Sequence, residues 1–457
     1  MDGRASTAWT TWRWILIAGF AIVASLNLPG QIGFDSTTAL WEGRHHLRMS
    51  WGPPMYSAIL GAFDAVVPGT GLFTAASLMT TALAWAALPL LRRRLAWSGP
   101  VLLALVFALP QILIYQGIVW RDVLFADLTV AAFVALALAA RVWPRPALRW
   151  SLLVLAVFAL AFGALVRQNG GVVIVPWALA LAWIAAQGRW RRGLAWMGAG
   201  LVAPLALALA LAAANPVHEA PDRNRSIGLR LLAHYDLMAA LAENPARPLP
   251  RMAADRPDAL DVLRREAPAT YSPTRIDTLD WNKRLQVKIW RFQAPVITAE
   301  WRDMIASDPV GYARRRLEVF RWVFLTPRLD LCVPLHLGVS GLPEVEKELG
   351  LIDGQRLQDP RLASYTARWF RTPFYSHLTY ALLAAAVAAL LMIRREPEDI
   401  AIAGLMVAVL GFTATFFFVS IACDYRYLYA VDLAAITGVL YLAIDPSLRR
   451  RKTDAAR

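Results

Sequence analysis

The sequence is poor in charge, cysteine and lysine, and each scarcity is informative. Only 18% of the 457 residues are charged, whereas 58% are hydrophobic, which excludes an ordinary soluble globular protein of this length. Cysteine occurs only as Cys332 and Cys423, too few for a disulfide framework or for a metal site built on cysteine alone. Lysine supplies four of the 47 basic residues, and this use of arginine fits a bacterial protein from a G+C-rich genome.

Long apolar segments dominate what is present. A hydrocarbon core of about 30 Å requires roughly 20 apolar residues per helix, and the sequence offers about ten such segments. They run from Trp14 to Gly33, Gly71 to Leu91, Gly99 to Val119, Leu124 to Ala140, Ser151 to Val166, Val172 to Gln187, Gly193 to Ala214, Phe374 to Ile393, Ile400 to Ile421 and Tyr427 to Ile444. We therefore predict an all-α polytopic membrane protein.

Arginines set the orientation of these segments. Basic clusters fall at every second connection and at the C-terminus, around Arg92, Arg145, Arg191, Arg394 and Arg450, and such clusters mark cytoplasmic ends. The net charge of +14 is explained in this way without a nucleic-acid partner. We expect a bacterial inner-membrane protein with both termini in the cytoplasm and its active site in the periplasm.

The first outer loop, residues 34–70, is too polar and too broken by proline to hold an extra span. We expect two helices along the membrane interface, from Ser36 to His46 and from Pro54 to Val66, because the loop also carries aromatic residues suited to headgroups. Trp51, next to the Pro53-Pro54 break, is one of them.

Three domains follow from the change in composition. Residues 1–214 form a transmembrane module of about seven helices, residues 215–373 a mostly helical periplasmic region, and residues 374–457 a second module of about three helices with a basic tail. Within the middle region, the stretch around Arg314, Arg315 and Arg316 has amphipathic helical spacing. It is expected to lie either on anionic headgroups or against the protein's own membrane domain. Cys332 and Cys423 would both lie outside, where the compartment allows a disulfide.

Polar residues gather at the predicted outer ends of the spans. Arg121 and Asp122 follow the third span, Arg167 with Gln168 and Asn169 follows the fifth, and Asp424 and Arg426 follow the ninth. Ionisable groups at membrane depth are costly unless they are paired or functional. Each arginine could instead extend to lipid headgroups, but several together would bind a phosphate while a carboxylate does proton chemistry.

This layout resembles the GT-C superfamily of integral-membrane glycosyltransferases, which includes protein O-mannosyltransferases and aminoarabinose transferases. The resemblance is carried by Asp35 before WGPPMYSAIL, by WRDVLF around Asp122 and by DYRYLY around Arg426. It covers about Trp14 to Asp127 and Thr372 to Asp445. It implies a polyprenyl-phosphate-linked sugar donor, an acceptor at the periplasmic face (a glycan, a lipid or a protein) and the bilayer as partner.

By the same resemblance, Asp35 is the catalytic base of a single inverting displacement. Asp122 would lie near the donor phosphate or a divalent metal ion, with Arg121 as either its partner or a substrate ligand. No cofactor is certain, and a divalent metal remains open. Relatives often carry an Asp-Glu pair at the first loop, whereas Ser36 follows Asp35 here.

The remaining candidates are substrate-binding residues. Arg167 and Arg426 are expected to bind the donor phosphate, and Gln168 and Asn169 to bind sugar hydroxyls. Glu42 could assist Asp35 or form a salt bridge with Arg44 or Arg48. His45 and Trp51 could contact substrate, but adjacent histidines such as His45 and His46 do not face one metal ion on a helix.

Two other functions use similar residues. A surface-polysaccharide polymerase or ligase would also need phosphate-binding arginines. A transporter or flippase of lipid-linked saccharides is disfavoured, since the sequence shows neither an internal repeat nor an interrupted span with a charge at the bilayer midplane.

Overall fold

A computed structural model describes residues 3–50, 52–92, 94–219 and 227–447. The chain divides into two compact units. The first comprises residues 1–218, 335–413 and 428–457, and the second comprises residues 219–334 and 414–427. The first unit thus takes in most of both predicted transmembrane modules together with residues 335–373.

The first unit is helical apart from two-residue strands. Its elements up to residue 219 are α1 (Gly3–Asn27), α2 (Phe34–His45), β1 (Leu47–Arg48), α3 (Pro54–Val66), α4 (Gly71–Ala87), η1 (Leu88–Leu91), α5 (Ser98–Val106), α6 (Pro110–Leu113), η2 (Tyr115–Gly117), α7 (Arg121–Arg141), α8 (Pro146–Val166), η3 (Gly170–Val173), α9 (Ile174–Ala186), α10 (Trp190–Ala213) and β2 (His218–Glu219), whose second residue opens the other unit. Later come α18 (Pro343–Leu349), α19 (Asp359–Ala367), η5 (Pro373–Tyr375), α20 (His377–Arg394), α21 (Pro397–Val419, which continues into the second unit) and α22 (Tyr429–Ile444).

The structure confirms the all-α polytopic class. Among the described residues, eight helices are long and apolar enough to cross a membrane, and they coincide with eight of the ten predicted spans. The predicted span Gly99–Val119 is instead a pair of helices, Ser98–Val106 and Pro110–Gly117, bent by 69°. The helix over Gly170–Ala186 is apolar but shorter than a full span.

The first span also ends earlier than predicted. α1 stops at Asn27 rather than at Gly33, because Pro29 and Gly30 follow, and Gly30 has a φ of +126° that favours glycine. The next residues are therefore extended, and their backbone groups are open to partners outside a helix.

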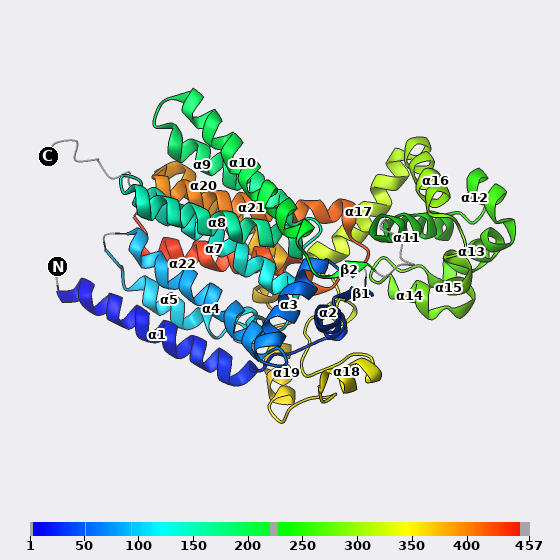
Figure 1. Cartoon of the computed structure of the whole chain (residues 1–457), viewed down its shortest axis with the longest axis horizontal. Helices are drawn as coiled ribbons and strands as arrows, with labels where there is room; N and C mark the ends of the chain where they lie inside the picture. The colour runs from blue at the N-terminus through cyan, green and yellow to red at the C-terminus, as the bar shows by residue number, and fades with distance from the viewer. Residues whose placement is uncertain (1–2, 51, 93, 220–226, 448–457) are drawn as a thin grey trace. The chain divides into compact units, whose positions relative to one another are not determined.

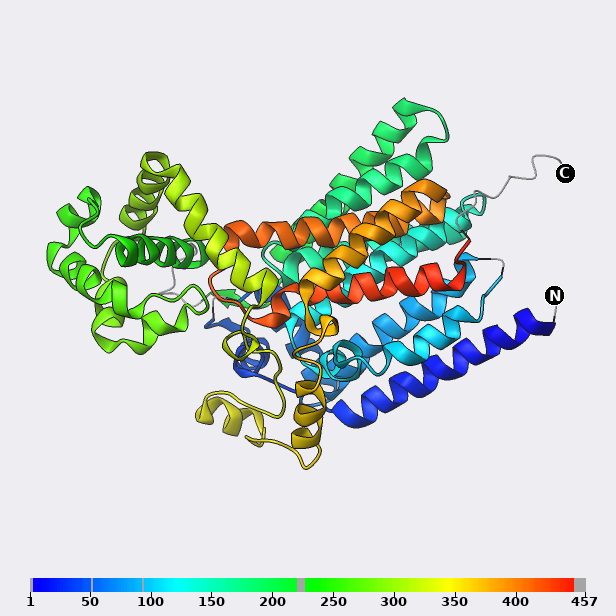
Figure 2. The same ribbon diagram turned by 180° about the vertical axis from the view of Figure 1, so that it is seen from behind.

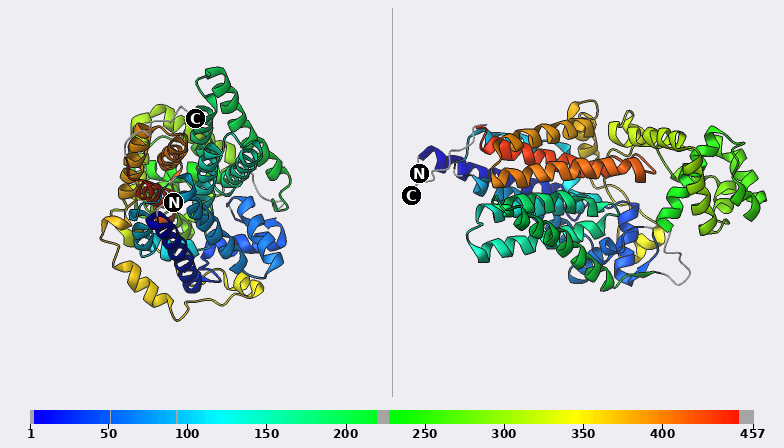
Figure 3. Two further views of the ribbon diagram at one scale, coloured as in Figure 1. Left: turned by 90° about the vertical axis from the view of Figure 1, so that its left-hand side faces the viewer. Right: turned by 90° about the horizontal axis from the view of Figure 1, so that it is seen from above.

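Helices of the first unit run side by side, with α7 and α22 at its centre (Figures 1 and 2). In each of these two, 83% of the apolar window is buried, against 28% in α1 and 17% in α10. Seen from the end in Figure 3, α9 and α10 stand at the margin of the bundle. Their exposed side chains, such as Val202 and Leu209, are suited to lipid.

One end of this bundle is tied by buried ion pairs. Asp399, fully buried in the first turn of α21, accepts from Arg92 and, at 2.6 Å, from Arg394. Arg92 also pairs with Glu396. Arginines predicted to mark a cytoplasmic face therefore also join η1, α20 and α21 to one another.

The second unit has its own core. It contains α11 (Ile227–Glu243), α12 (Pro250–Asp255), α13 (Pro257–Thr270), α14 (Asp277–Trp281), α15 (Lys283–Ile289), α16 (Ala294–Ser307), α17 (Pro309–Leu325), η4 (Leu329–Leu331) and η6 (Tyr425–Leu428, whose last residue belongs to the first unit). Tyr235, Leu260, Leu285 and Ile297 are among the buried residues that pack together. This region is mostly helical, as predicted.

The arginine run of the second unit packs against protein. Arg316 is buried, with Nη1 3.0 Å from Asp236 Oδ1 and Nε donating to the carbonyl of Phe417. Arg315 Nη1 lies 2.8 Å from Glu243, and Arg314 pairs with the same carboxylate. The contacts of these arginines therefore lie within the second unit, and they differ from both of the predicted surfaces, lipid headgroups and the membrane domain.

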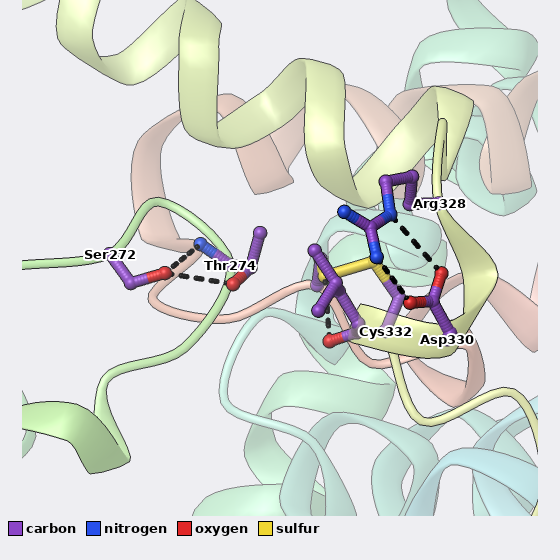
Figure 4. The surroundings of a disulfide bond; sticks show 7 residues. Ser272, Thr274, Arg328, Asp330 and Cys332 are labelled. Atoms are coloured by element: carbon purple, nitrogen blue, oxygen red, sulfur yellow. Dashed lines mark hydrogen bonds and ion pairs between the residues drawn. A yellow bond between two sulfur atoms is a disulfide. The ribbon is translucent and has the colours of Figure 1, made fainter.

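Cys332 and Cys423 form a disulfide, which Figure 4 shows beside the Arg328–Asp330 ion pair. The bond links two parts of the second unit that are 91 residues apart in sequence. Two backbone bonds flank it, from Tyr425 N to Cys332 O and from Cys423 N to Thr274 O. The segment that carries Arg426 is thereby fastened to the rest of that unit.

Candidate functional site

Residues 31–33 lie between two other chain segments of the first unit. On one side, Gln31 N donates to Gly117 O and Val119 N donates to Gln31 O. On the other side, Ile32 N donates to Gly338 O, and Ser340 N donates back to Ile32 O. The early end of α1 makes this possible, since a helix would have used these backbone groups internally.

Asp35 stands in the first turn of α2, directly after this junction. Its neighbour Ser36 is buried, and its hydroxyl donates to the carbonyl of Val119. Tyr56 of α3 donates to the same carbonyl at 3.1 Å. These bonds hold the half-buried Asp35 beside the segment that leads into α7.

Trp120 and His336 flank the start of α2. A methyl group on Gly33 would lie 3.5 Å from both Trp120 Nε1 and His336 Nε2. The two rings themselves have centroids 6.2 Å apart. Two rings with hydrogen-bonding nitrogens therefore lie close to the backbone that carries the candidate base.

Arg121 and Asp122 open α7 and are both nearly buried. Arg121 reaches the first loop, where its Nη1 would lie 3.3 Å from a methyl group on Gly52. Asp122 Oδ1 lies 2.8 Å from Nη1 of Arg167, at the end of α8. Of the predicted set, Asp122 and Arg167 thus pair with each other, while Arg121 is directed toward the first loop.

Glu42 is buried inside the first loop. Its carboxylate accepts from the amides of Met49 (2.7 Å) and Ser50 and from the hydroxyl of Ser57 (2.6 Å). Glu42 therefore holds the turn after α2 to α3. Of the two salt-bridge partners predicted for Glu42, Arg44 and Arg48, Arg44 pairs with another carboxylate.

That carboxylate is Asp64 of α3, 2.7 Å from Arg44. Partial burial opposes the ionisation of Asp64, but bonds from Arg44 and from the Gly69 amide outweigh it and lower the pKa of the carboxyl. The pair fixes α2, the helix that carries Asp35, against α3.

His45 lies on the surface away from this junction. Its Nε2 is 2.7 Å from Glu348 of α18, and its ring lies against that of Trp41, with centroids 4.3 Å apart and the planes tilted by 31°. Trp41 Nε1 donates to the same carboxylate at 2.7 Å. These contacts join α2 to α18.

The remaining candidates have different positions. Gln168 is exposed and Asn169 half-buried, both directly after Arg167 in the first unit. Arg426 belongs to the second unit, where its Nη2 lies 3.1 Å from Asp424 and its guanidinium lies over Tyr427. Trp51 falls outside the described residues.

A buried polar network supports the junction from inside the bundle. Asp127, one and a half turns into α7 and fully buried, accepts from Ser77, from Thr81 at 2.7 Å and from Gln116 at 2.9 Å. Gln116 belongs to the bent pair and also donates to Tyr429 of α22. The break in the third span is therefore hydrogen-bonded to α7 and α22, and through Asp127 it is linked to α4. Val119 and Trp120 of the site follow directly after this break.

The residues do not form an evident metal centre. In the described ranges, no three histidine, cysteine, aspartate or glutamate side chains gather as a group that could hold a metal ion. Asp122, the metal candidate from the sequence, is paired with an arginine. No step proposed below is routed through a metal ion.

His336 is the site residue that sequence reasoning missed. It lies in a stretch with no periodic pattern, within the predicted outer region and far from the other candidates in sequence. Only the backbone pairing of residues 338–340 with Ile32 brings it to the first loop. Trp120, by contrast, was visible as the first letter of WRDVLF.

The site is thus a carboxylate, two arginines and two nitrogen-bearing rings at one end of a polytopic helical bundle. No protein-family model and no curated protein matches the chain. Among solved structures, the chain is similar to the Archaeoglobus fulgidus oligosaccharyltransferase in its apo form, with 15% identity, 94% of this chain and 50% of that chain covered, and a TM-score of 0.43.

Two further structures of that archaeal oligosaccharyltransferase are similar. One is a complex with an inhibitory peptide and a dolichol-phosphate (14% identity, 94% and 50% covered, TM-score 0.43), and the other a complex with zinc and sulfate (14% identity, 94% and 49% covered, TM-score 0.42). The chain spans about half the length of these structures.

Proposed function

We propose that the protein is a membrane glycosyltransferase that moves a sugar from a polyprenyl-phosphate-linked donor to an acceptor hydroxyl. The observation that carries the proposal is the junction in which Ser36 and Tyr56 bind the carbonyl of Val119. It joins the helix that carries Asp35 to the segment that leads into Arg121, the first residue of α7. A base and a phosphate-binding cation are the two groups that such a transfer needs.

In the proposed reaction, the Asp35 carboxylate takes the proton of the acceptor hydroxyl. The hydroxyl oxygen attacks the anomeric carbon, and the bond from that carbon to the phosphate oxygen breaks. The bonding electrons leave with the polyprenyl phosphate, whose added charge is stabilised by Arg121. The transfer inverts the anomeric carbon and needs no covalent enzyme intermediate.

Arg121 is the better phosphate ligand of the two candidate arginines in the first unit. Arg167 is committed to Asp122 in a buried pair, and breaking such a pair to bind a ligand would leave a buried charge alone. Arg121 also stands in the first turn of the 21-residue helix α7, where the helix dipole favours an anion. Trp120, His336, Gln168 and Asn169, which all belong to the first unit, are proposed as contacts to the sugar or the acceptor.

Arginine clusters at the opposite helix ends of the first unit support a site at the periplasmic face of a bacterial inner membrane, through the positive-inside rule. For the second unit, the disulfide is typical of an oxidising compartment such as the periplasm.

The test is transfer of labelled sugar from polyprenyl-phosphate sugars by the purified protein, with Asp35→Asn as the main variant. Loss of the base should lower turnover about 10²- to 10⁴-fold while leaving the thermal unfolding temperature unchanged, because Asp35 is only half-buried. Asp303→Asn, an exposed carboxylate of the second unit, is the matched control. Full turnover in Asp35→Asn would reject Asp35 as the base.

One observation favours a second candidate, a transporter of lipid-linked saccharides. The bent pair of the third span and the buried Asp127 beside it are features that transporters use to build substrate sites. The same preparations in sealed vesicles distinguish the two. Saccharide crossing the membrane without any transfer by the wild type would favour transport.

A further inference from the structure

A cavity of about 310 Å³ lies between α8, α9 and α10, at the margin of the first unit. All of its lining residues are apolar, and they include Trp150, Leu153, Phe158, Trp177, Trp196 and Ala203. None of them belongs to the junction around Asp35. The cavity is partly open, and Phe158 remains 44% exposed, so it is reached from the side of the bundle.

The cavity follows α8 from near its first turn toward its middle. Trp150 and Phe158 are eight residues apart, or about 12 Å along a helix, which is close to the depth of one leaflet of the hydrocarbon core at roughly 15 Å. Arg167, which pairs with Asp122, lies after the opposite end of the same helix. The cavity therefore occupies the half of the bundle that is remote from the candidate site.

An aromatic and cationic cluster lies at the end of the cavity near the first turn of α8. Trp196 and Trp150, both lining residues, have ring centroids 5.4 Å apart, and Trp143 lies 5.6 Å from Trp196. The guanidinium of Arg149 lies 5.1 Å from the ring of Trp143 and 5.4 Å from that of Trp150. Indole rings with an arginine beside an apolar depth are typical of a membrane interface.

Two buried donors in this cluster lack an acceptor among the described residues. They are Nε1 of Trp143, whose side chain is only 7% exposed, and Nε of Arg149. Buried donors without partners are uncommon because each costs free energy. A bound oxygen-rich anion would satisfy both.

Positive charge at this end is not limited to Arg149. Arg145 precedes α8, and Arg189, Arg191 and Arg192 lie at the start of α10, which the short turn after α9 places at the same end. Basic pockets between transmembrane helices are suited to anionic lipid headgroups. The charge thus complements a phosphate at the mouth and the apolar lining complements a hydrocarbon chain.

We propose that this cavity binds one acyl chain of an anionic glycerophospholipid of the bilayer, with its phosphate held by Arg149 and Trp143. The lipid would be a structural ligand, separate from any sugar donor. Its acyl chain would pack between α10 and the helices α8 and α9. The proposal does not depend on the function assigned to Asp35.

Native mass spectrometry of the full chain, stripped in detergent and reloaded with single lipids, tests the proposal. We expect retention of one phosphatidylglycerol, with phosphatidylcholine retained less. Arg149→Gln should reduce phosphatidylglycerol retention about fivefold, as expected for one arginine at a lipid phosphate. Equal retention of phosphatidylglycerol and phosphatidylcholine would overturn the proposal, as would equal retention of phosphatidylglycerol in Arg149→Gln and the wild type.

A second pair of variants separates filling of the cavity from loss of fold. Ala203→Phe would fill the cavity and should abolish retention, whereas Ala206→Phe, on an exposed residue of α10 that does not line the cavity, should retain the lipid. Asp35→Asn should retain it too, because Asp35 lies at the other end of the bundle. Retention in Ala203→Phe equal to that in Ala206→Phe would mean that only annular lipid had been measured.

Discussion

Asp122 and Arg167 form an ion pair that is nearly closed to solvent, with 2.8 Å between Oδ1 and Nη1 and exposed fractions of 2% and 4%. The pair joins the first turn of α7 to the end of α8. A buried pair of this kind adds little net stability over apolar residues, but losing one partner leaves a buried charge alone. Its place next to Arg121 makes it a positioning device for the proposed phosphate ligand.

Arg167→Met should therefore lower the free energy of unfolding by about 3–5 kcal/mol. Arg167→Met combined with Asp122→Leu should recover much of that loss, since no lone charge then remains. Thermal unfolding in detergent measures both variants. Arg251→Ala, which removes an exposed pair with Asp303, is the control and should cost less than about 1 kcal/mol. Equal effects of Arg167→Met and Arg251→Ala would contradict the buried-pair interpretation.

Arg121 is predicted to act on donor binding and on departure of the phosphate. Arg121→Gln should reduce kcat/KM for the donor about 10- to 100-fold, the range for loss of a hydrogen bond to a charged group. Arg121→Lys should restore only part of it, because lysine lacks the planar fork of donors. Steady-state kinetics with varied donor measures the effect, with the exposed Arg361→Gln as control. An unchanged kcat/KM in Arg121→Gln would remove Arg121 from the site.

The sequence predicted the fold class and about ten membrane spans, eight of which coincide with long apolar helices among the described residues, because apolar length and arginine position are local properties of the chain. It placed Asp35, Arg121 and Asp122 at the same end of the bundle for the same reason. It could not predict that residues 28–33 leave the helix and pair with segments around Val119 and Val339. That pairing depends on backbone bonds between distant residues, and the position of His336 follows from it.

The partners of charged residues were also beyond the sequence. The sequence suggested Glu42 as a partner for Arg44, but Arg44 forms its ion pair with Asp64. Glu42 instead accepts two backbone amides and a hydroxyl. The choice is made by how α2 packs on α3, which neither composition nor spacing describes.

His336 should contribute to turnover without contributing much to stability. Its half-buried ring lies beside Gly33 and Trp120, so His336→Phe keeps the ring contact and removes both nitrogens. We expect kcat/KM to fall about tenfold, the loss of one hydrogen bond to substrate, with His336→Gln less affected. His46→Phe, at an exposed residue of the first loop, should leave turnover unchanged. A fall in unfolding temperature that explains the lost activity would indicate a purely structural role.

The disulfide should stabilise the second unit. Replacing Cys332 and Cys423 together by serine should cost about 2–4 kcal/mol, the usual range for a bond that closes a long loop. Hydrogen exchange of the full chain, followed in peptides that cover Thr274 and the Tyr425 segment, locates the loss. Adding reductant to the double serine variant should change nothing further. Exchange that is the same in the serine variant and the oxidised wild type would contradict this prediction.

His234 makes the second unit sensitive to acid. It is buried on α11, 2% exposed, with its ring 5.1 Å from Trp290, and burial together with the charge of Arg230 lowers its pKa from 6.5 to about 3. Between those two values the unfolded chain binds a proton that the folded unit excludes. Stability is therefore greatest above about pH 6.5 and falls as the pH drops, by at most about 1.4 kcal/mol per pH unit.

His234→Phe removes this proton uptake and keeps an aromatic ring beside Trp290. Hydrogen exchange of peptides from α11, measured on the full chain between about pH 4.5 and 7.5 and corrected for intrinsic exchange rates, should show a shallower loss of protection than in the wild type. At pH 4.5 the His234→Phe variant should therefore have lost about 2–3 kcal/mol less of its free energy of unfolding than the wild type. His46→Phe, exposed in the first unit, should follow the wild type. Identical pH dependence in His234→Phe and the wild type would show that His234 is already protonated in the folded unit.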